Sequence, residues 1–270
     1  MSYFSGLRVL VTGAGSGIGE KMALALAAQG AEIIVTARRK EAAAAVAKKI
    51  IEAGGSAHGM VLDVSKLGTI EGFRKRLHEK VGAIDILINN AGVVFGGEFE
   101  KVAIKDHLNT YQINILGVVA VTHAFMDDLI SSRKGHLVNI ASASAYVGLP
   151  FGSTYASSKW AVLGFSESLR LELRERGIGN VHVTTVCPSY ISTGMFDGVK
   201  SPLLSPMLTP EKVVRAIIKG IRDKQALVQQ PAMVKGIDFL KGSLPLPVWD
   251  EVAKIAGIST SMKHWRGKTD

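Results

Sequence analysis

Short apolar runs alternate with longer helix-like stretches along most of the 270-residue chain. The apolar runs are rich in Val, Ile and Leu at consecutive positions, which is typical of parallel strands covered on both faces. They lie at residues 7–11, 33–36, 58–62, 86–89, 136–141, 182–187 and 226–229. The helix-like stretches lie at 18–29, 40–53, 66–81, 105–130, 154–176 and 210–222, the last with Thr209 as its expected N-cap. This alternation predicts an α/β fold with right-handed crossovers and a doubly wound parallel sheet.

No internal repeat and no linker divides the chain. A chain of this length buries roughly 75% of its unfolded surface as one unit, so we expect a single domain over residues 1–270. Residues 189–208 break the strand–helix rhythm and carry Pro202 and Pro206. A connection of that length without regular structure is usually functional, so we expect a substrate lid there. Residues 231–270 are expected to form a C-terminal extension.

Composition excludes several classes of protein. The lone cysteine, Cys187, excludes an intrachain disulfide, and the seven histidines show no paired spacing, so no metal site is expected. No uninterrupted apolar run reaches about 18 residues, so no transmembrane segment is expected. The net charge of +9 is concentrated after residue 206, but no aromatic residues are interleaved and no nucleic-acid-binding module is present. We therefore expect a cytoplasmic protein, with peripheral contact of the basic tail with anionic lipid as an alternative.

A glycine-rich turn directly follows the first candidate strand. It reads Thr12-Gly13-Ala14-Gly15-Ser16-Gly17-Ile18-Gly19 and leads into an alanine-rich helix. Glycines let a backbone approach a pyrophosphate closely, while free amides at the helix start bind its charge. Because the turn joins the first strand to the first helix of an α/β chain, it predicts a dinucleotide site at Gly13, Ser16, Gly17, Ile18 and Gly19.

The end of the second candidate strand indicates which dinucleotide binds. An acidic residue at this point would accept hydrogen bonds from the adenosine ribose and repel a 2′-phosphate. The sequence has Ala37 there, followed by Arg38 and Arg39, whose guanidinium groups suit a phosphate. Glu41 is the alternative acid, although it falls in the first turn of the next helix. The sequence therefore predicts NADP(H) as cofactor, with NAD(H) as the alternative.

Several polar residues follow the later strands or interrupt an apolar helix. Tyr155 and Lys159 are four residues apart on a predicted helix, so they share one face, and an adjacent ammonium favours the phenolate needed for acid–base chemistry. Ser142 ends the fifth candidate strand and is expected to hold a substrate oxygen, with Ser144 as the competing serine. Asn114 is expected to bind a backbone carbonyl and to order a water that relays protons to Lys159.

These elements together resemble the short-chain dehydrogenase/reductase family, in the form that has about the length of this chain. The resemblance covers residues 6 to about 230 and rests on Thr12–Gly19, Asn89-Asn90-Ala91-Gly92, Asn114, Ser142 and Tyr155-Ala156-Ser157-Ser158-Lys159. It implies a Rossmann-type seven-stranded sheet, an Asn114–Ser142–Tyr155–Lys159 tetrad and a homodimer or homotetramer. It also implies cofactor contacts at Tyr155, Lys159, Asp63, Val64, Asn90, Ala91, Gly92, Pro188, Ile191 and Thr193. One departure is Ser189, where the family usually has glycine after the proline.

A narrower resemblance points to retinol and 17β-hydroxysteroid dehydrogenases. It rests on Thr193-Gly194-Met195-Phe196, Leu208-Thr209-Pro210-Glu211, Leu244-Pro245 and Ser261-Met262-Lys263. It implies an apolar alcohol or carbonyl substrate that is steroid-, retinoid- or lipid-like. The candidate substrate contacts are Ser142, Val147, Leu149, Phe151, Met195 and Phe196.

Two other functions fit parts of the pattern. Nucleotide-sugar epimerases and dehydratases share the tyrosine–lysine spacing, but they usually have a longer C-terminal substrate domain and a differently spaced glycine loop. A cofactor-sensing module without turnover would keep the glycine loop, although a complete tetrad favours an enzyme. The sequence thus predicts an NADP(H)-dependent oxidoreductase that interconverts an alcohol and its carbonyl, with an NAD(H)-preferring alcohol dehydrogenase as the alternative.

Overall fold

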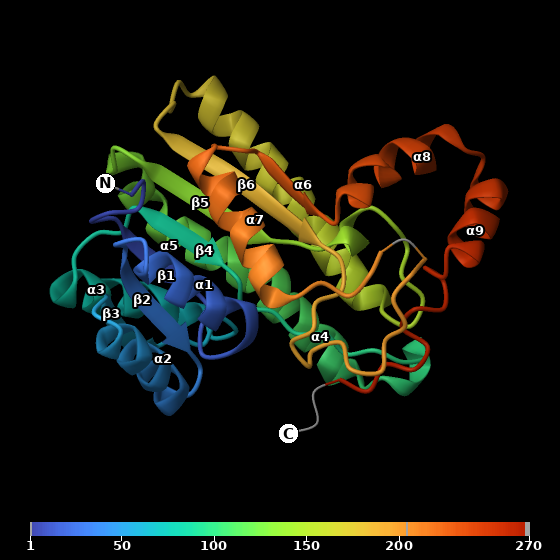
Figure 1. Cartoon of the computed structure of the whole chain (residues 1–270), viewed down its shortest axis with the longest axis horizontal. Coiled ribbons are helices and arrows are strands. Elements are labelled where there is room, and N and C mark those ends of the chain that lie inside the picture. The colour runs from blue at the N-terminus through green and yellow to red at the C-terminus, as the bar shows by residue number, and fades with distance from the viewer. Residues whose placement is uncertain (1, 204, 268–270) are drawn as a thin grey trace.

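The computed structural model describes residues 2–203 and 205–267. Within these residues seven parallel strands form one sheet in the order β3-β2-β1-β4-β5-β6-β7 (Figure 1). The strands are β1 (Arg8–Val11), β2 (Glu32–Ala37), β3 (Ser56–Val61), β4 (Ile86–Asn89), β5 (Gly135–Ile140), β6 (Val181–Pro188) and β7 (Leu227–Gln230). The chain winds outward from β1 to β3 and then crosses to β4 on the other side of β1. This reversal lies between β1 and β4, at the place where open α/β sheets bind ligands beyond the carboxyl ends of their strands.

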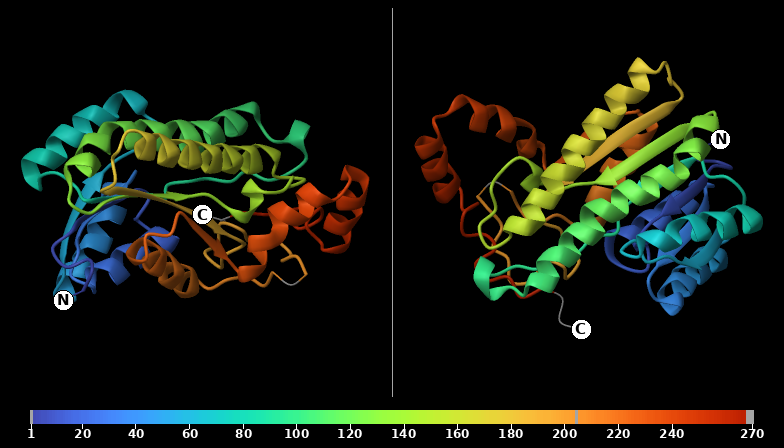
Figure 2. Two further views of the ribbon diagram at one scale, coloured as in Figure 1. Left: turned by 90° about the horizontal axis from the view of Figure 1, so that it is seen from above. Right: turned by 180° about the vertical axis from the view of Figure 1, so that it is seen from behind.

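Helices cover both faces of the sheet (Figure 2). One face packs against α1 (Gly17–Ala27), α2 (Lys40–Glu52) and α7 (Pro210–Arg222), and the other against α3 (Ile70–Lys80), α5 (Gly117–Ser131) and α6 (Ser153–Glu175). The N-cap expected at the start of α7 is present, because the Thr209 hydroxyl accepts from the Lys212 amide at 3.3 Å. The predicted Rossmann-type, doubly wound parallel sheet is therefore confirmed.

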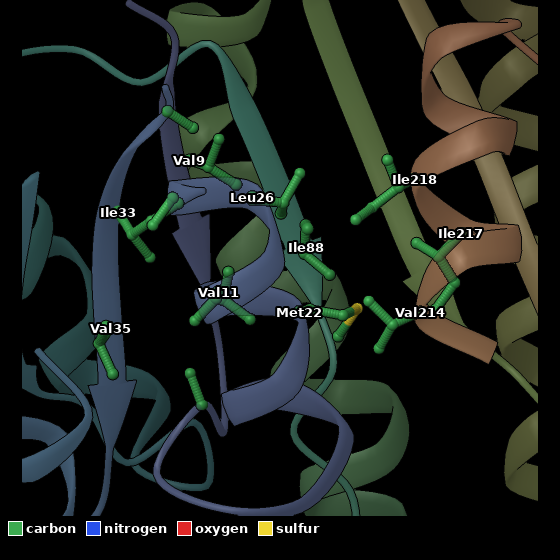
Figure 3. Close-up of a cluster of buried hydrophobic side chains, with 14 of the residues drawn as sticks. Val9, Val11, Met22, Leu26, Ile33, Val35, Ile88, Val214, Ile217 and Ile218 are labelled. Atoms are coloured by element: carbon green, nitrogen blue, oxygen red, sulfur yellow. The ribbon is translucent and has the colours of Figure 1, made fainter. Parts of the chain in front are cut away.

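Successive side chains of a strand point to opposite faces, so each strand feeds two cores. Val9 and Val11 of β1 pack with Met22 and Leu26 of α1 (Figure 3). Leu10, between them, belongs to the core on the opposite face. Full burial of a side chain of this size contributes about 1.5–3 kcal/mol, which explains why consecutive positions of β1 are apolar from Val9 to Val11.

The predicted helix over 105–130 is interrupted. It begins as α4 (Ile104–Tyr111), passes through one π turn (Gln112–Leu116) and continues as α5. Residues Ile104–Ser131 as a whole are long and apolar enough to cross a membrane by length and composition, although polar residues interrupt their apolar pattern. Half of the apolar window in this stretch is buried within the fold, as expected of a helix that packs against a sheet.

The segments expected as a lid and as a C-terminal extension meet at one end of the sheet. Between residues 189 and 208 the described residues form no helix or strand beyond an isolated bridge between Ile191 and Leu208. After β7 the chain forms α8 (Ile237–Ser243) and α9 (Leu246–Ile255), which project beyond the sheet (Figure 1). Residues 256–267 then return to the 190–200 loop and hydrogen-bond to it.

Candidate active site

A cavity of about 1410 Å³ lies at the carboxyl end of the sheet. It is larger than the roughly 300–1,000 Å³ of an ordinary small-molecule pocket, so it has room for a dinucleotide and a second ligand. The predicted cofactor residues and the predicted tetrad line it, except for Asn114. Of the predicted substrate residues, Ser142, Val147, Leu149, Met195 and Phe196 line it, and Phe151 does not.

The glycine loop forms a wall without side chains at one end of this cavity. Gly13 has a φ of +64°, and a Cβ atom there would lie 2.8 Å from the Cα of Ala91. A Cβ atom at Gly19 would lie 2.5 Å from both the Gly13 carbonyl oxygen and Nδ2 of Asn90. Ser16 is the N-cap of α1 and makes no side-chain capping bond. The glycines let a pyrophosphate approach the backbone closely, and the uncapped start of α1 leaves amide groups free to bind its charge.

Two side chains hold this loop against the end of β4. Nδ2 of Asn90 donates to the carbonyl oxygens of Thr12 and Gly13, at 2.9 and 3.1 Å. In return, the Thr12 hydroxyl accepts from the amides of Asn90 and Ala91, both at 3.0 Å. The stretch after β4 therefore borders the glycine loop through four hydrogen bonds.

Two arginine side chains after β2 place positive charge at the cavity. Arg38 and Arg39 are exposed and line the cavity, and neither forms an ion pair with any residue of the described ranges. The residue before them, at the position where an acidic side chain would bind the adenosine ribose, is Ala37. Glu41 lies in the first turn of α2 and does not line the cavity. Both guanidinium groups are therefore available to an anionic ligand.

Tyr155 and Lys159 lie on the first two turns of α6 and are buried. Lys159 Nζ donates to the Ile140 carbonyl oxygen at 2.8 Å and lies 5.7 Å from the centroid of the Tyr155 ring. Burial lowers the pKa of Lys159 to about 8. Burial also raises the pKa of Tyr155, and the nearby Ser142 hydroxyl opposes this only in part.

This direction differs from the sequence expectation, in which Lys159 favours the phenolate. The physical reason is the apolar cluster around the Tyr155 ring, which includes Phe196 and Met262 and disfavours any charge on Oη. The hydroxyl of Tyr155 therefore keeps its proton at neutral pH in the protein alone, and it is available as a proton donor.

Ser142 and Ser144 have different surroundings, although both line the cavity. The Ser142 hydroxyl oxygen accepts from the Ser144 amide at 3.1 Å and caps the 3-10 turn Ala143–Ala145. Because this bond uses a lone pair of Oγ, the hydroxyl hydrogen of Ser142 remains free to donate. The Ser144 hydroxyl oxygen is buried and has no partner among the described residues. Both hydroxyl hydrogens are therefore free to donate into the cavity, and the role of Ser142 in holding a substrate oxygen stays a prediction.

Asn114 lies in the π turn and is fully buried. Its Nδ2 donates to the Val93 carbonyl oxygen at 2.9 Å and to the Ser158 hydroxyl at 3.0 Å, while its Oδ1 accepts from the Val93 amide at 2.9 Å. Two of these three hydrogen bonds therefore join the Asn114 side chain to Val93, in the stretch after β4. A Cβ atom at Gly92 would lie 3.4 Å from Oδ1 of Asn114 and 3.6 Å from Nζ of Lys159, so Gly92 borders both side chains. A proton relay from Asn114 to Lys159 stays a prediction.

Comparison with known proteins decides the family. Residues 8–203 match the sequence model of the short chain dehydrogenases, which is well over half of the chain. The chain belongs to the short-chain dehydrogenase/reductase family. It is 35% identical to epidermal retinol dehydrogenase 2 of Mus musculus over 263 residues, which are 96% of this chain and 85% of that protein. It is 33% identical to estradiol 17-beta-dehydrogenase 11 of Homo sapiens over 239 residues, which are 88% of this chain and 79% of that protein.

Solved structures of the family have the same fold. A short-chain dehydrogenase/reductase from Burkholderia phymatum in complex with NAD superposes with a TM-score of 0.80 at 24% identity, covering 100% of this chain and 99% of that one. A metagenomic short-chain oxidoreductase in complex with NADP has a TM-score of 0.70 at 28% identity, covering 84% and 96%. This family member is therefore an NAD(P)-dependent dehydrogenase/reductase.

The cavity of this short-chain dehydrogenase/reductase also has lining residues that the sequence did not lead us to expect. Among them are Tyr190, Trp249, Ser261 and Trp265. Trp249 and Trp265 are two of the three tryptophans of the chain. Trp265 stands between His264 and Arg266, so the expectation of a basic tail without interleaved aromatic residues is wrong here, and these rings were a signal for cavity residues. Tyr190 and Ser261 lie in irregular segments, and no periodic pattern marks them.

Proposed function

We propose that this enzyme interconverts an apolar alcohol and its carbonyl, with NADP(H) as cofactor and Tyr155 as the proton donor and acceptor. The observation that carries the proposal is that the glycine loop, Ser142, Tyr155 and Lys159 all line one cavity. The rest of that cavity has a largely apolar wall, which includes Val147, Leu149, Met195, Phe196, Trp249 and Ile258. An apolar wall with few convergent polar groups suits an apolar molecule that carries one reactive oxygen.

The residues around the cavity fit a nicotinamide dinucleotide. In the proposal Gly13, Ser16 and Gly19 border its pyrophosphate, and Arg38 with Arg39 bind the 2′-phosphate. The family resemblance adds Lys159 as a ligand of the nicotinamide ribose. When bound, the nicotinamide supplies or accepts a hydride.

The chain's own residues transfer the proton to and from the substrate oxygen. The free hydrogen of the Ser142 hydroxyl donates to the substrate oxygen and so orients it. Tyr155 gives its Oη proton to that oxygen during reduction and takes it back during oxidation. Lys159, whose pKa lies near 8, carries a positive charge at neutral pH that stabilises the transient phenolate. Phe196 packs edge-to-face against the buried Tyr155 ring and excludes water from it.

The cofactor preference is tested by quenching of intrinsic fluorescence, since Trp249 and Trp265 line the cavity. We expect NADPH to bind at least tenfold more tightly than NADH at one ionic strength, which is about 1.4 kcal/mol. Arg38→Ala should remove most of that difference. Equal or tighter binding of NADH would contradict the NADP(H) proposal and favour an NAD(H)-dependent alcohol dehydrogenase.

The catalytic role is tested with Tyr155→Phe, which keeps the ring and removes the hydroxyl. We expect kcat to fall by roughly 10² to 10⁴, the usual contribution of a positioned acid–base group, with NADPH affinity retained. Tyr3→Phe is the matched control, because Tyr3 lies before β1 and does not line the cavity. A Tyr155→Phe protein with near-normal turnover would exclude the mechanism. Tight NADPH binding by a wild-type protein that turns over no alcohol or carbonyl would favour a cofactor sensor.

The proposal also covers the location of the protein in the cell and its oligomeric state. We infer a cytoplasmic homodimer or homotetramer whose basic tail can contact anionic lipid peripherally. Light scattering measures the assembly, and flotation with anionic vesicles at low and high salt measures the lipid contact. Binding that does not depend on salt would contradict an electrostatic contact.

A further inference from the structure

Residues 261–266, near the C-terminus, pack against the 190–200 loop, and we call this segment the roof of the loop. Trp265 Nε1 donates to the Met195 carbonyl oxygen at 3.1 Å, and the Arg266 amide donates to the Asp197 carbonyl oxygen at 2.9 Å. The Lys200 amide donates to the Ser261 carbonyl oxygen at 3.1 Å. Residues 261–266 therefore hydrogen-bond to three backbone positions of a loop that has no regular structure of its own.

One side-chain bond joins this roof to the aromatic cluster below it. The hydroxyls of Tyr190 and Ser261 lie 2.8 Å apart, and both residues are buried. The Ser261 hydroxyl donates to the Ile258 carbonyl oxygen at 2.8 Å, so it must accept its bond from Tyr190. Burial raises the pKa of Tyr190 to about 12, which keeps the donating proton in place. The direction of the bond is thus fixed from Tyr190 to Ser261.

Tyr190 in turn contacts the same ring that covers the proposed proton donor. Phe196 packs edge-to-face against Tyr190, with ring centroids 5.1 Å apart and planes at 72°. Phe196 also packs edge-to-face against Tyr155, with centroids 5.8 Å apart and planes at 75°. The position of Phe196 on Tyr155 therefore depends on Tyr190, which Ser261 anchors.

We propose that Tyr190 and Ser261 are positioning residues that hold Phe196 as the apolar wall beside Tyr155 and thereby favour substrates with a long apolar chain. This inference rests on the proposed function, in which Tyr155 meets the reacting oxygen. A short substrate needs only the polar contacts to Ser142 and Tyr155. A long one also contacts the wall that includes Met195 and Phe196, and it loses that contact when the loop is free to move.

Tyr190→Phe is the cleaner variant, because it removes the bond while the Ser261 hydroxyl keeps its partner Ile258. Ser261→Ala tests the other side of the bond. Thr260→Ala is the matched control, since Thr260 is exposed and makes no side-chain hydrogen bond with the described residues. Thermal melting identifies any variant that fails to fold.

The first readout is amide hydrogen exchange of residues 190–199 in the cofactor-free protein. We expect exchange to speed up about fivefold to tenfold in Tyr190→Phe and Ser261→Ala, the effect of losing one net hydrogen bond, and to stay unchanged in Thr260→Ala. The second readout is NADPH-dependent reduction of two probes, decanal and propanal. We expect KM for decanal to rise about fivefold to tenfold while kcat, the KM for propanal and NADPH affinity stay within about twofold.

The two proposals fail in distinguishable ways. If exchange and the decanal KM of both variants match those of Thr260→Ala, the positioning role is wrong even when the wild type is an active reductase. If KM rises equally for both aldehydes, the two residues act on the whole site and not on the apolar wall, which also overturns the inference. If the wild type reduces neither aldehyde, the proposed function fails for this substrate class, and the exchange rates alone decide whether the bond holds the loop.

Discussion

Lys159 lies one helical turn after Tyr155 on α6, with its Nζ 5.7 Å from the centroid of the Tyr155 ring. Burial acts on these two groups in the same sense, because it disfavours the charged form of each. The pKa of Tyr155 rises and the pKa of Lys159 falls to about 8. A charge on either group is therefore costly before the cofactor binds, although Lys159, with a pKa of about 8, still carries its proton at pH 7. This cost can be measured as stability.

Replacing Lys159 with Met should stabilise the cofactor-free protein at pH 7 while turnover is lost. The folded-state pKa is about 8 and the ordinary value is 10.5, so below pH 8 the folded state holds a buried ammonium that the unfolded state solvates. Between the two values the folded state releases its proton and the penalty disappears. We expect a gain of up to roughly 3 kcal/mol at pH 7 that vanishes near pH 10.5.

Urea denaturation of both proteins at the two pH values measures this gain. Loss of the 2.8 Å bond from Lys159 to the Ile140 carbonyl oxygen offsets part of it at both pH values. The pH dependence of the difference is therefore the decisive quantity. A difference that is the same at pH 7 and pH 10.5 would show that burial of the charge is not the cause.

The buried side chain of His136, near the amino-terminal end of β5, should make the stability of the protein sensitive to acid. The Thr184 hydroxyl donates to the Gln225 carbonyl oxygen at 2.6 Å, so it must accept from His136 Nε2, 2.7 Å away. Nδ1 of His136 is buried and has no partner in the described ranges. Burial, with His182 and Lys224 nearby, lowers the pKa of His136 to about 3. The imidazole is therefore neutral in the folded protein.

Because the unfolded state binds a proton at this residue near pH 6.5 and the folded state only near pH 3, stability should fall as the pH drops between these values. The expected loss from this group is up to roughly 5 kcal/mol. His136→Gln keeps a donor for Thr184 without a titrating ring, so its stability should depend less on pH over that range. The exposed His123→Gln is the control. Parallel stability profiles for wild type and His136→Gln would contradict the prediction.

The sheet and the grouping of Ser142, Tyr155 and the glycine loop could be predicted from the sequence. Apolar runs and helix periods are local patterns, and parallel strands bring their carboxyl ends to one edge whatever the side chains between them. The relative placement of Gly13 and Ser142, far apart in the chain, follows from that topology alone.

The π turn at Asn114 and the roof over the loop could not be predicted in the same way. The apolar pattern runs on through 104–131, and the extra residue in one turn is stabilised by the bonds of Asn114 with Val93, a residue outside the helix. Most contacts of the roof use backbone carbonyl oxygens, as at Met195, which any residue supplies. A sequence carries no sign of such bonds. Burial of Tyr155, which raises its pKa, also involves Met262 of this roof and Phe196 of the loop below it.

Ala37→Asp should convert the cofactor preference. The variant places a carboxylate at the end of β2, beside Arg38 and Arg39, where it repels a 2′-phosphate and can accept from a ribose hydroxyl. We expect NADPH to bind at least tenfold more weakly and NADH more tightly, as measured by fluorescence titration, a change of about 1.4 kcal/mol or more. Ala45→Asp makes the same charge change on the exposed face of α2, outside the cavity, and should alter neither affinity. Equal weakening by both variants would assign the effect to net charge.

Two glycine-to-alanine variants should have opposite effects. A Cβ atom at Gly19 would lie 2.5 Å from the Gly13 carbonyl oxygen and from Nδ2 of Asn90, so the turn must shift. Gly164 lies inside α6 with nothing within 4 Å of such an atom, so alanine there only improves helix propensity. We expect Gly19→Ala to lower stability by about 1–3 kcal/mol, the cost of overpacking, and to weaken NADPH binding at least tenfold. We expect Gly164→Ala to raise stability by about 0.5–1 kcal/mol and to leave NADPH binding unchanged.

Urea denaturation and NADPH titration of the two variants separate packing from ligand binding. The turn that Gly19 would displace is the one that Asn90 ties to the end of β4, so the loss of affinity should exceed what the loss of stability explains. Measured well below the denaturation midpoint, both variants are fully folded, and any difference in affinity then belongs to the site. If Gly19→Ala bound NADPH as tightly as Gly164→Ala does, the glycine loop would not be the pyrophosphate wall.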